Sequence, residues 1–148
     1  MHSLAQGAAI MGLASFFIHY FFMSAFMTAE PANIRPSLGK FYAGSIMALL
    51  MVIIEIAMHH ASHPYMSLWI YVAPAFIVVA LVAAYRTQYG VSERQYLEEM
   101  IEHHSMAILT SQRILEKQPS TPVARIAADI LETQKKEIAA MRAIINTS

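Results

Sequence analysis

The chain has 148 residues, of which 57% are hydrophobic and 14% charged, and its ten basic residues balance ten acidic ones. This composition is typical of a folded chain rather than a disordered one. The zero net charge excludes nucleic-acid binding by bulk electrostatic attraction. Because the chain contains no cysteine, disulfides, thiolate metal sites, iron–sulfur clusters and cysteine nucleophiles are excluded as well. Methionine and histidine are abundant instead, with 11 and 7 residues.

The charged residues are unevenly spread along the chain, and this divides it into two predicted domains. Only four of them lie between Met1 and Tyr85, whereas sixteen lie between Arg86 and Ser148. We therefore expect an all-α protein in which a membrane domain over residues 1–85 is followed by a soluble helical hairpin over residues 86–148.

The first domain contains three segments long and apolar enough to cross a bilayer, which takes about 20 helical residues. The predicted transmembrane helices cover residues 4–29, 41–60 and 65–85, and only the second carries a charge, Glu55. Pro74 lies near the centre of the third, where neighbouring helices can satisfy the carbonyl that proline leaves free. Close helix contact is favoured at four small residues, Gly7, Gly12, Ala43 and Gly44.

Lysine and arginine near the ends of the spans predict the orientation in the membrane. The first link carries Arg35 and Lys40, the second link, from His59 to Pro64, carries neither residue type, and Arg86 and Arg94 follow the third span. The positive-inside rule then predicts an integral protein of the cell's inner membrane, with its N-terminus outside and the hairpin in the cytoplasm.

Two helices are predicted in the second domain, over about residues 92–118 and 121–147. Ser92 is a good N-cap, and the glutamine three residues later completes a capping box. Thr121 caps the next helix, with Pro122 at its first position. The short connection between the helices predicts an antiparallel hairpin.

Apolar residues recur with helical periodicity in both helices of the hairpin. The predicted inner face of the second helix consists of Val123, Ile126, Ala127, Ile130, Ile138, Met141 and Ile145. Because two helices alone bury little apolar surface, we expect the hairpin to pair with a second copy of the chain in a four-helix bundle, most simply in a dimer, or to pack on another partner.

Side chains with metal-binding or hydrogen-bonding atoms are predicted to meet between the two helices. Six of them lie on the facing surfaces: Met100, His103 and His104 on the first helix, and Gln134, Glu137 and Met141 on the second. With the turn centred near residues 119–120, Met100 is expected opposite about residue 139 and His103 opposite about residue 136.

Burying such groups costs about 1–3 kcal/mol each unless they are satisfied, and two explanations stay open. The first is a hydrogen-bonded polar layer, for example His104 with Gln134 and His103 with Glu137. The second is a bound metal. Thioethers and imidazoles without thiolate favour Cu(I), with Ag(I) as its soft mimic, and disfavour magnesium and calcium. A zinc site would not normally recruit methionine.

These residues also resemble a known family. The stretch Tyr96-Leu-Glu-Glu-Met100-Ile-Glu-His103-His104-Ser-Met-Ala107 is similar to the signature of the domain of unknown function 305 family, which is typically Met-Ile-Pro-His-His followed by a polar residue and Ala. Gln134-Lys-Lys-Glu137-Ile-Ala-Ala-Met141 is similar to the family's second motif. The resemblance covers about residues 85–146, and the preceding helices resemble a membrane-embedded subgroup of the family.

The resemblance implies a ferritin-like helical fold and an association with copper and silver. Carried over by position, it implies Met100, His103, His104 and Met141 as metal ligands, with Gln134 and Glu137 as supporting groups. One departure from the family pattern is Glu102, which stands where the family usually has proline. This glutamate adds a carboxyl group beside the histidine pair.

A second candidate metal site lies at the end of the second span. His59, His60 and His63 cluster there, close to Met58. The alternative is a solvated link whose imidazoles lie at the lipid headgroups. Glu55 is an ionisable group inside a span and is by default a functional-site hypothesis. Stripes of methionine on the first two spans are interpreted either as ordinary packing or as a relay for Cu(I).

We therefore expect a non-enzymatic membrane protein that handles Cu(I) or Ag(I) for buffering, tolerance or hand-over, with a metallochaperone or a larger membrane complex as its partner. Two alternatives stay open: a structural or assembly subunit without metal, and an oligomeric metal transporter that uses Glu55. A di-iron site is disfavoured because Met100 stands three residues before His103, where that pattern needs glutamate.

Overall fold

The computed structural model describes residues 3–63 and 65–147, and every regular element within these ranges is helical. The predicted all-α fold is confirmed for this part of the chain. The outer limits of the two predicted domains, Met1 and Ser148, and the end of the second predicted link, Pro64, lie outside the described residues.

The helices form two compact units, whose boundaries differ from those of the two predicted domains. The first unit runs to Phe22 and resumes over Leu38–Gly90, and the second contains Met23–Ser37 and continues from Val91. The segment Met23–Ser37, which the charge distribution assigns to the membrane domain, therefore packs with the hairpin.

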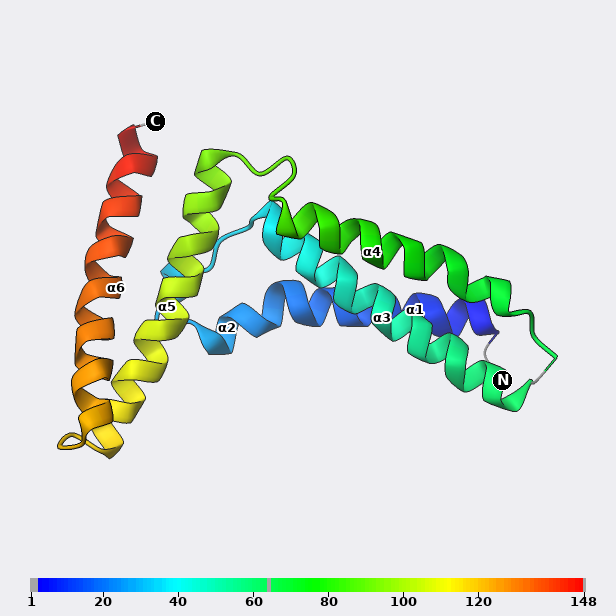
Figure 1. The fold of residues 1–148 in the computed structure, drawn as a ribbon, viewed down its shortest axis with the longest axis horizontal. Helices are drawn as coiled ribbons and strands as arrows, with labels where there is room; N and C mark the ends of the chain where they lie inside the picture. Colours follow the sequence, from blue (N-terminus) through cyan, green and yellow to red (C-terminus); the bar gives the residue numbers. More distant parts are fainter. Residues whose placement is uncertain (1–2, 64, 148) are drawn as a thin grey trace. The chain divides into compact units, whose positions relative to one another are not determined.

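Three helices make up most of the first unit (Figure 1): α1 spans Leu4–Phe17, α3 spans Leu38–Ser62, and α4 spans Val72–Arg86. Both α1 and α4 pack against α3. Glycines allow the approach of α1, because a Cβ on Gly12 would lie only 3.0 Å from Cγ2 of Val52. The predicted close helix contact is therefore confirmed at this glycine.

Three helical runs have the length and composition to cross a membrane, namely Leu4–Met27, Leu38–Ser62 and Leu68–Arg86. They agree with the predicted spans to within a few residues. The first run contains a π-helical turn over Ile18–Phe22, after which α2 spans Met23–Met27. Large apolar side chains on these runs are more than half exposed in the isolated chain, as lipid-facing residues would be: Ile10, Leu13, Phe76 and Val79.

The third run differs from its prediction at its beginning. The Ser67 side chain accepts a hydrogen bond from the backbone N–H of Trp69 and caps a 3₁₀ turn, Leu68–Tyr71, before α4 begins at Val72. Pro74 therefore lies in the first turn of α4 and not near the centre of a helix. The first N–H groups of a helix have no intrahelical partner, so proline is accommodated there without help from a neighbouring helix.

The second unit is built on the antiparallel pair of α5, Glu93–Lys117, and α6, Pro122–Thr147 (Figure 1). Ser92 caps α5 through the predicted capping box. The Thr121 hydroxyl accepts a hydrogen bond from the backbone N–H of Ala124 at 3.2 Å, as expected for the cap of α6. The core between the helices is formed by Ile101, Ile108, Ile138 and Met141.

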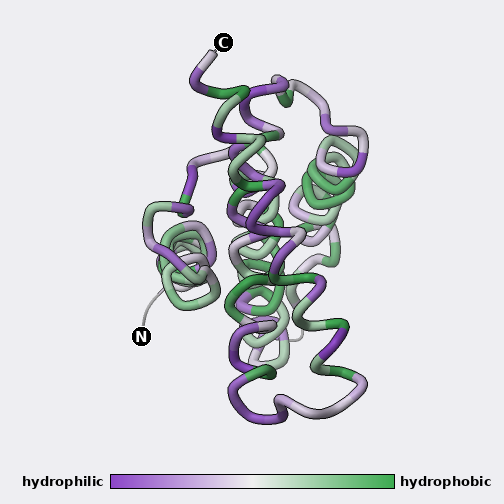
Figure 2. Tube along the Cα trace, turned by 90° about the vertical axis from the view of Figure 1, so that its left-hand side faces the viewer, coloured by the Kyte–Doolittle hydropathy of each residue, from purple (hydrophilic) through white to green (hydrophobic). Residues whose placement is uncertain are grey.

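The buried face of α6 is narrower than predicted. Ala127, Ile138 and Met141 are buried and Ile145 is half-buried, whereas Val123, Ile126 and Ile130 are exposed. Figure 2 shows hydrophilic and hydrophobic residues alternating along this helix. The reason is that α6 packs mainly on a single helix, α5. One neighbouring helix covers only part of the apolar face that the helical periodicity predicts to be buried.

Candidate functional site

A cluster of three polar side chains connects α5 and α6. His104 Nε2 lies 2.8 Å from Glu137 Oε2, and Gln134 Nε2 donates to the same oxygen at 3.2 Å. The side chains of His104 and Glu137 are 20% and 49% exposed, so the cluster lies at the edge of the interface. A polar layer is thus present, but His104 pairs with Glu137 rather than with Gln134.

The contact between His104 and Glu137 sets the register of the hairpin. One turn back along α5 corresponds to one turn forward along the antiparallel α6, which places Met100 opposite Met141. Both methionines belong to the same apolar cluster, Met141 as a buried member and Met100 packed against it. The predicted register had Met100 opposite about residue 139. The difference arises because side chains lean toward the N-terminus of their own helix, which displaces contacting residues in an antiparallel pair.

His103 does not join this cluster. Successive residues of an α-helix are rotated by about 100°, so neighbouring side chains face different surroundings. His104 faces α6, while the side chain of His103 is 54% exposed and its Nε2 lies 3.9 Å from Glu99 Oε1 on the same helix. The expected pairing of His103 with Glu137 is not formed, and the two histidines face different surroundings.

The α5–α6 interface therefore gathers one imidazole, one carboxyl group, one amide and two thioethers. Within residues 3–63 and 65–147, no group of three or more His, Asp or Glu side chains is arranged to hold a metal ion.

The histidines of the second candidate site point to separate partners. The rings of His59 and His63 stack with their centroids 4.2 Å apart, and His63 Nδ1 lies 3.1 Å from the carbonyl oxygen of His59. The ring of His60 instead faces Tyr71, whose hydroxyl lies 3.5 Å from His60 Nδ1.

Two further residues of this candidate site lie elsewhere on α3. The side chain of Met58 is exposed. The Glu55 carboxyl group lies against α1, where a Cβ on Gly7 would overlap it. The small residue at position 7 therefore makes room for an ionisable group in the contact between two candidate membrane spans.

A buried hydrogen-bond network on another face of α5 is not predicted by the sequence. Glu102 is 5% exposed, and its two carboxyl oxygens accept hydrogen bonds from the Ser24 hydroxyl and, at 2.9 Å, from the backbone N–H of Arg35. Glu102 thus satisfies polar groups at both ends of the segment Met23–Ser37.

Ser105 holds the middle of the same segment. This residue is fully buried, and its hydroxyl oxygen accepts hydrogen bonds from the Ala29 backbone N–H and from Asn33 Nδ2, each at 3.0 Å. The Ser37 hydroxyl donates to Glu99 Oε2 at 3.3 Å. Glu99, Glu102 and Ser105 follow each other at three-residue intervals, so a polar row on one face of α5 is the signal that could have revealed this contact.

The comparisons with known proteins agree with the motif resemblance. The family described as domain of unknown function (DUF305) matches residues 80–145. An uncharacterized protein of Acanthamoeba polyphaga mimivirus is 33% identical over 140 residues, which covers 93% of this chain and 90% of that protein. No solved structure gives a significant match. With a relative this similar over nearly its whole length, the chain belongs to the DUF305 family.

Proposed function

We propose that the hairpin binds Cu(I), or Ag(I) as its soft mimic, between α5 and α6 through Met100, His104 and Met141. The observation that carries this proposal is the register set by the contact between His104 and Glu137, which places the two thioethers opposite each other one turn away. Two thioethers and an imidazole without thiolate form a donor set that suits Cu(I).

Glu137 fits the role of a group that orients the ligand. When His104 Nε2–H donates to the Glu137 carboxylate, the lone pair of the imidazole lies on Nδ1, which can then bind a metal. Gln134 donates to the same carboxylate oxygen and holds it in place. This arrangement of metal, histidine and carboxylate is common among metal-binding histidines.

The methionines also suit a site that binds and releases its metal reversibly. Without metal, Met100 and Met141 pack as apolar side chains in the core cluster and leave no unsatisfied polar group behind. Loading the site exchanges packing contacts for coordination bonds. A membrane-anchored hairpin of this kind would buffer the metal, confer tolerance or hand the metal on, without catalysing a reaction.

The test is a competition titration of the full chain in detergent micelles against a chelator of known Cu(I) affinity. We expect the double variant Met100→Leu with Met141→Leu, and separately His104→Ala, to weaken Cu(I) binding at least tenfold. Leucine conserves the volume of methionine and costs less than about 1.5 kcal/mol, so the helix content measured by circular dichroism should be kept.

Two matched variants serve as controls. Met106→Leu removes a thioether from α5 outside the proposed donor set, and His103→Ala removes the exposed imidazole next to His104; both should bind Cu(I) as the unaltered chain does. The copper proposal is wrong if the double leucine variant keeps full affinity. It is also wrong if His103→Ala weakens binding as much as His104→Ala.

A second candidate function, an assembly module, is favoured by an exposed stripe on α6. Three large apolar side chains recur there at three- and four-residue spacing, and a fourth lies two heptads further on; they are 38–62% exposed: Val123, Ile126, Ile130 and Ile144. We infer that a second copy of the hairpin covers this stripe in a four-helix bundle. Replacing Ile126 and Ile130 by lysine should then convert a dimer into a monomer in light scattering, and an unchanged mass would exclude this interface.

A further inference from the structure

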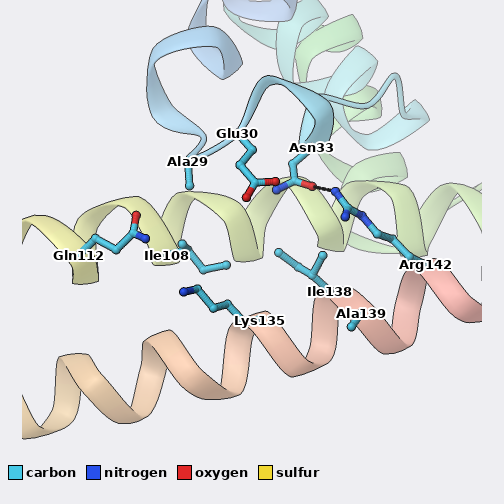
Figure 3. A pocket seen from close by; sticks show the side chains of 9 residues that line it. All are labelled: Ala29, Glu30, Asn33, Ile108, Gln112, Lys135, Ile138, Ala139 and Arg142. Carbon is cyan, nitrogen blue, oxygen red and sulfur yellow. Dashed lines mark hydrogen bonds between the residues drawn. The ribbon is translucent and has the colours of Figure 1, made fainter.

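A cleft of about 270 Å³ opens in the second unit between α5, α6 and the chain that follows α2 (Figure 3). Its apolar floor includes Ile108 and Ile138, and polar side chains surround this floor. The volume is slightly below the range of about 300–1,000 Å³ that is typical of pockets for drug-sized ligands. The cleft therefore suits a small polar group.

Three charged side chains line the cleft: Glu30 from the segment after α2, and Lys135 and Arg142 from α6. Arg142 donates one hydrogen bond to the side-chain oxygen of Asn33, which is neutral. In the part of the chain that the structure describes, none of the three charged groups belongs to an ion pair. Two cationic side chains and one carboxylate thus line the cleft without forming ion pairs with one another.

These charges match a ligand that carries both signs. A guanidinium has five N–H donors, so Arg142 keeps donors for an oxyanion after its bond to Asn33, and arginine binds phosphate in a bidentate manner. Lys135 lies two turns before Arg142 on α6 and adds a second cation at the same cleft. The Glu30 carboxylate would repel a simple anion but would accept hydrogen bonds from an ammonium group.

The position of the cleft along the chain favours a lipid as the source of this group. The first candidate membrane span ends at Met27, and the cleft residues Ala29, Glu30 and Asn33 follow within six positions. An extended chain advances at most about 3.6 Å per residue, and the headgroup layers add about 5–8 Å on each side of the hydrocarbon core. If Leu4–Met27 spans the bilayer, the cleft begins at headgroup depth.

We propose that this cleft binds a zwitterion that combines a phosphate with a primary ammonium group, supplied by the headgroup of a phosphatidylethanolamine lipid. Arg142 binds the phosphate, and Lys135 at the other end of the cleft adds positive charge to the site. Glu30 accepts hydrogen bonds from the ammonium group, and the apolar floor contacts the carbon atoms of the headgroup. The proposal is independent of copper binding, because it uses none of the metal-ligand side chains.

Native mass spectrometry of the full chain, released from detergent after incubation with one lipid at a time, tests this proposal. We expect about tenfold greater retention of phosphatidylethanolamine than of phosphatidylcholine, whose quaternary ammonium has no N–H donor, and than of phosphatidylglycerol, which has no cation. Lys135→Gln combined with Arg142→Gln should abolish this retention. Lys136→Gln, an adjacent lysine that pairs with Glu132 outside the cleft, should leave it unchanged.

The sharpest readout is the preference of the Glu30→Gln variant, because it does not depend on whether the double variant folds. Losing the carboxylate should abolish the preference for phosphatidylethanolamine over phosphatidylglycerol, so that phosphatidylglycerol is retained at least as well. Equal retention of all three lipids by the unaltered chain would overturn the proposal, as would an unchanged preference in Glu30→Gln. Displacement of the lipid by equimolar free phosphoethanolamine would show that the ligand is the soluble zwitterion and that the lipid assignment is wrong.

Discussion

Replacing Glu102 by alanine tests whether the segment Met23–Ser37 is held on α5 by buried hydrogen bonds. The substitution leaves the Ser24 hydroxyl and the Arg35 backbone N–H without their acceptor in a buried site. An orphaned buried donor costs about 1–3 kcal/mol, so docking of the segment should weaken by about 2–6 kcal/mol. The Glu102→Gln variant keeps one acceptor oxygen and should lose about half as much.

Amide hydrogen exchange of the full chain in lipid nanodiscs measures this loss directly. Exchange of a docked segment proceeds through local opening, and each 1.4 kcal/mol changes an equilibrium tenfold. Peptides covering Met23–Ser37 should therefore exchange at least about 30-fold faster in Glu102→Ala and at least about fivefold faster in Glu102→Gln.

The matched control is Glu116→Ala on the same helix. That glutamate pairs with Arg113 where both side chains are about 60% exposed, and exposed ion pairs contribute at most about 1 kcal/mol. Exchange in Met23–Ser37 should stay unchanged in this control. If Glu102→Ala exchanges no faster than Glu116→Ala, the carboxyl group of Glu102 does not hold the segment and the reasoning is refuted.

Three further predictions concern local structure. Ser92→Ala and Thr121→Ala each remove a helix cap and should lower the free energy of unfolding of the hairpin by about 1 kcal/mol in urea titrations; unchanged midpoints would contradict the caps. Gly90 adopts φ +70° at the end of the first unit, so Gly90→Ala should lower the free energy of unfolding of that unit, measured in the full chain in detergent, by about 1–2 kcal/mol; a neutral effect would contradict this backbone conformation. A hydrogen bond from Lys136 and its charge lower the pKa of Glu132. The pairing therefore stabilises the fold at pH values above the ordinary carboxyl pKa, and this stabilisation is lost as the pH falls through the lowered pKa. Lys136→Met should raise the pKa of Glu132 in an NMR titration.

The two helices of the hairpin and their caps could be predicted from the sequence because their signals are local. Ser92 and the glutamine three residues later form the capping box within one turn, and Thr121 with Pro122 begins the next helix in the same local way. The lengths of the apolar runs likewise predict the candidate membrane spans. None of these features depends on which surface packs against which partner.

The docking of Met23–Ser37 on α5 depends on contacts between residues far apart in the chain. Ser24 and Glu102 are separated by 78 positions, and Asn33 and Ser105 by 72. Charge counting assigned this segment to the membrane side because it carries few charged residues. The segment is bound to α5 through hydrogen bonds from hydroxyl groups, an amide and backbone N–H groups, and counting charged residues does not detect these groups.

The candidate metal site shows the corresponding limit of helical periodicity. A spacing of i, i+3 and i+4 places Met100, His103 and His104 within one broad arc of α5, but a single neighbouring helix covers only part of that arc. Met100 and His104 contact α6, and Glu102 accepts hydrogen bonds from the segment Met23–Ser37. His103 contacts neither partner and remains exposed. The glutamate that replaces the family's usual proline thus belongs to the docking network. Its proximity in sequence to the histidines does not make it part of the proposed copper ligands, so copper affinity and segment docking should respond to different substitutions on the same helix.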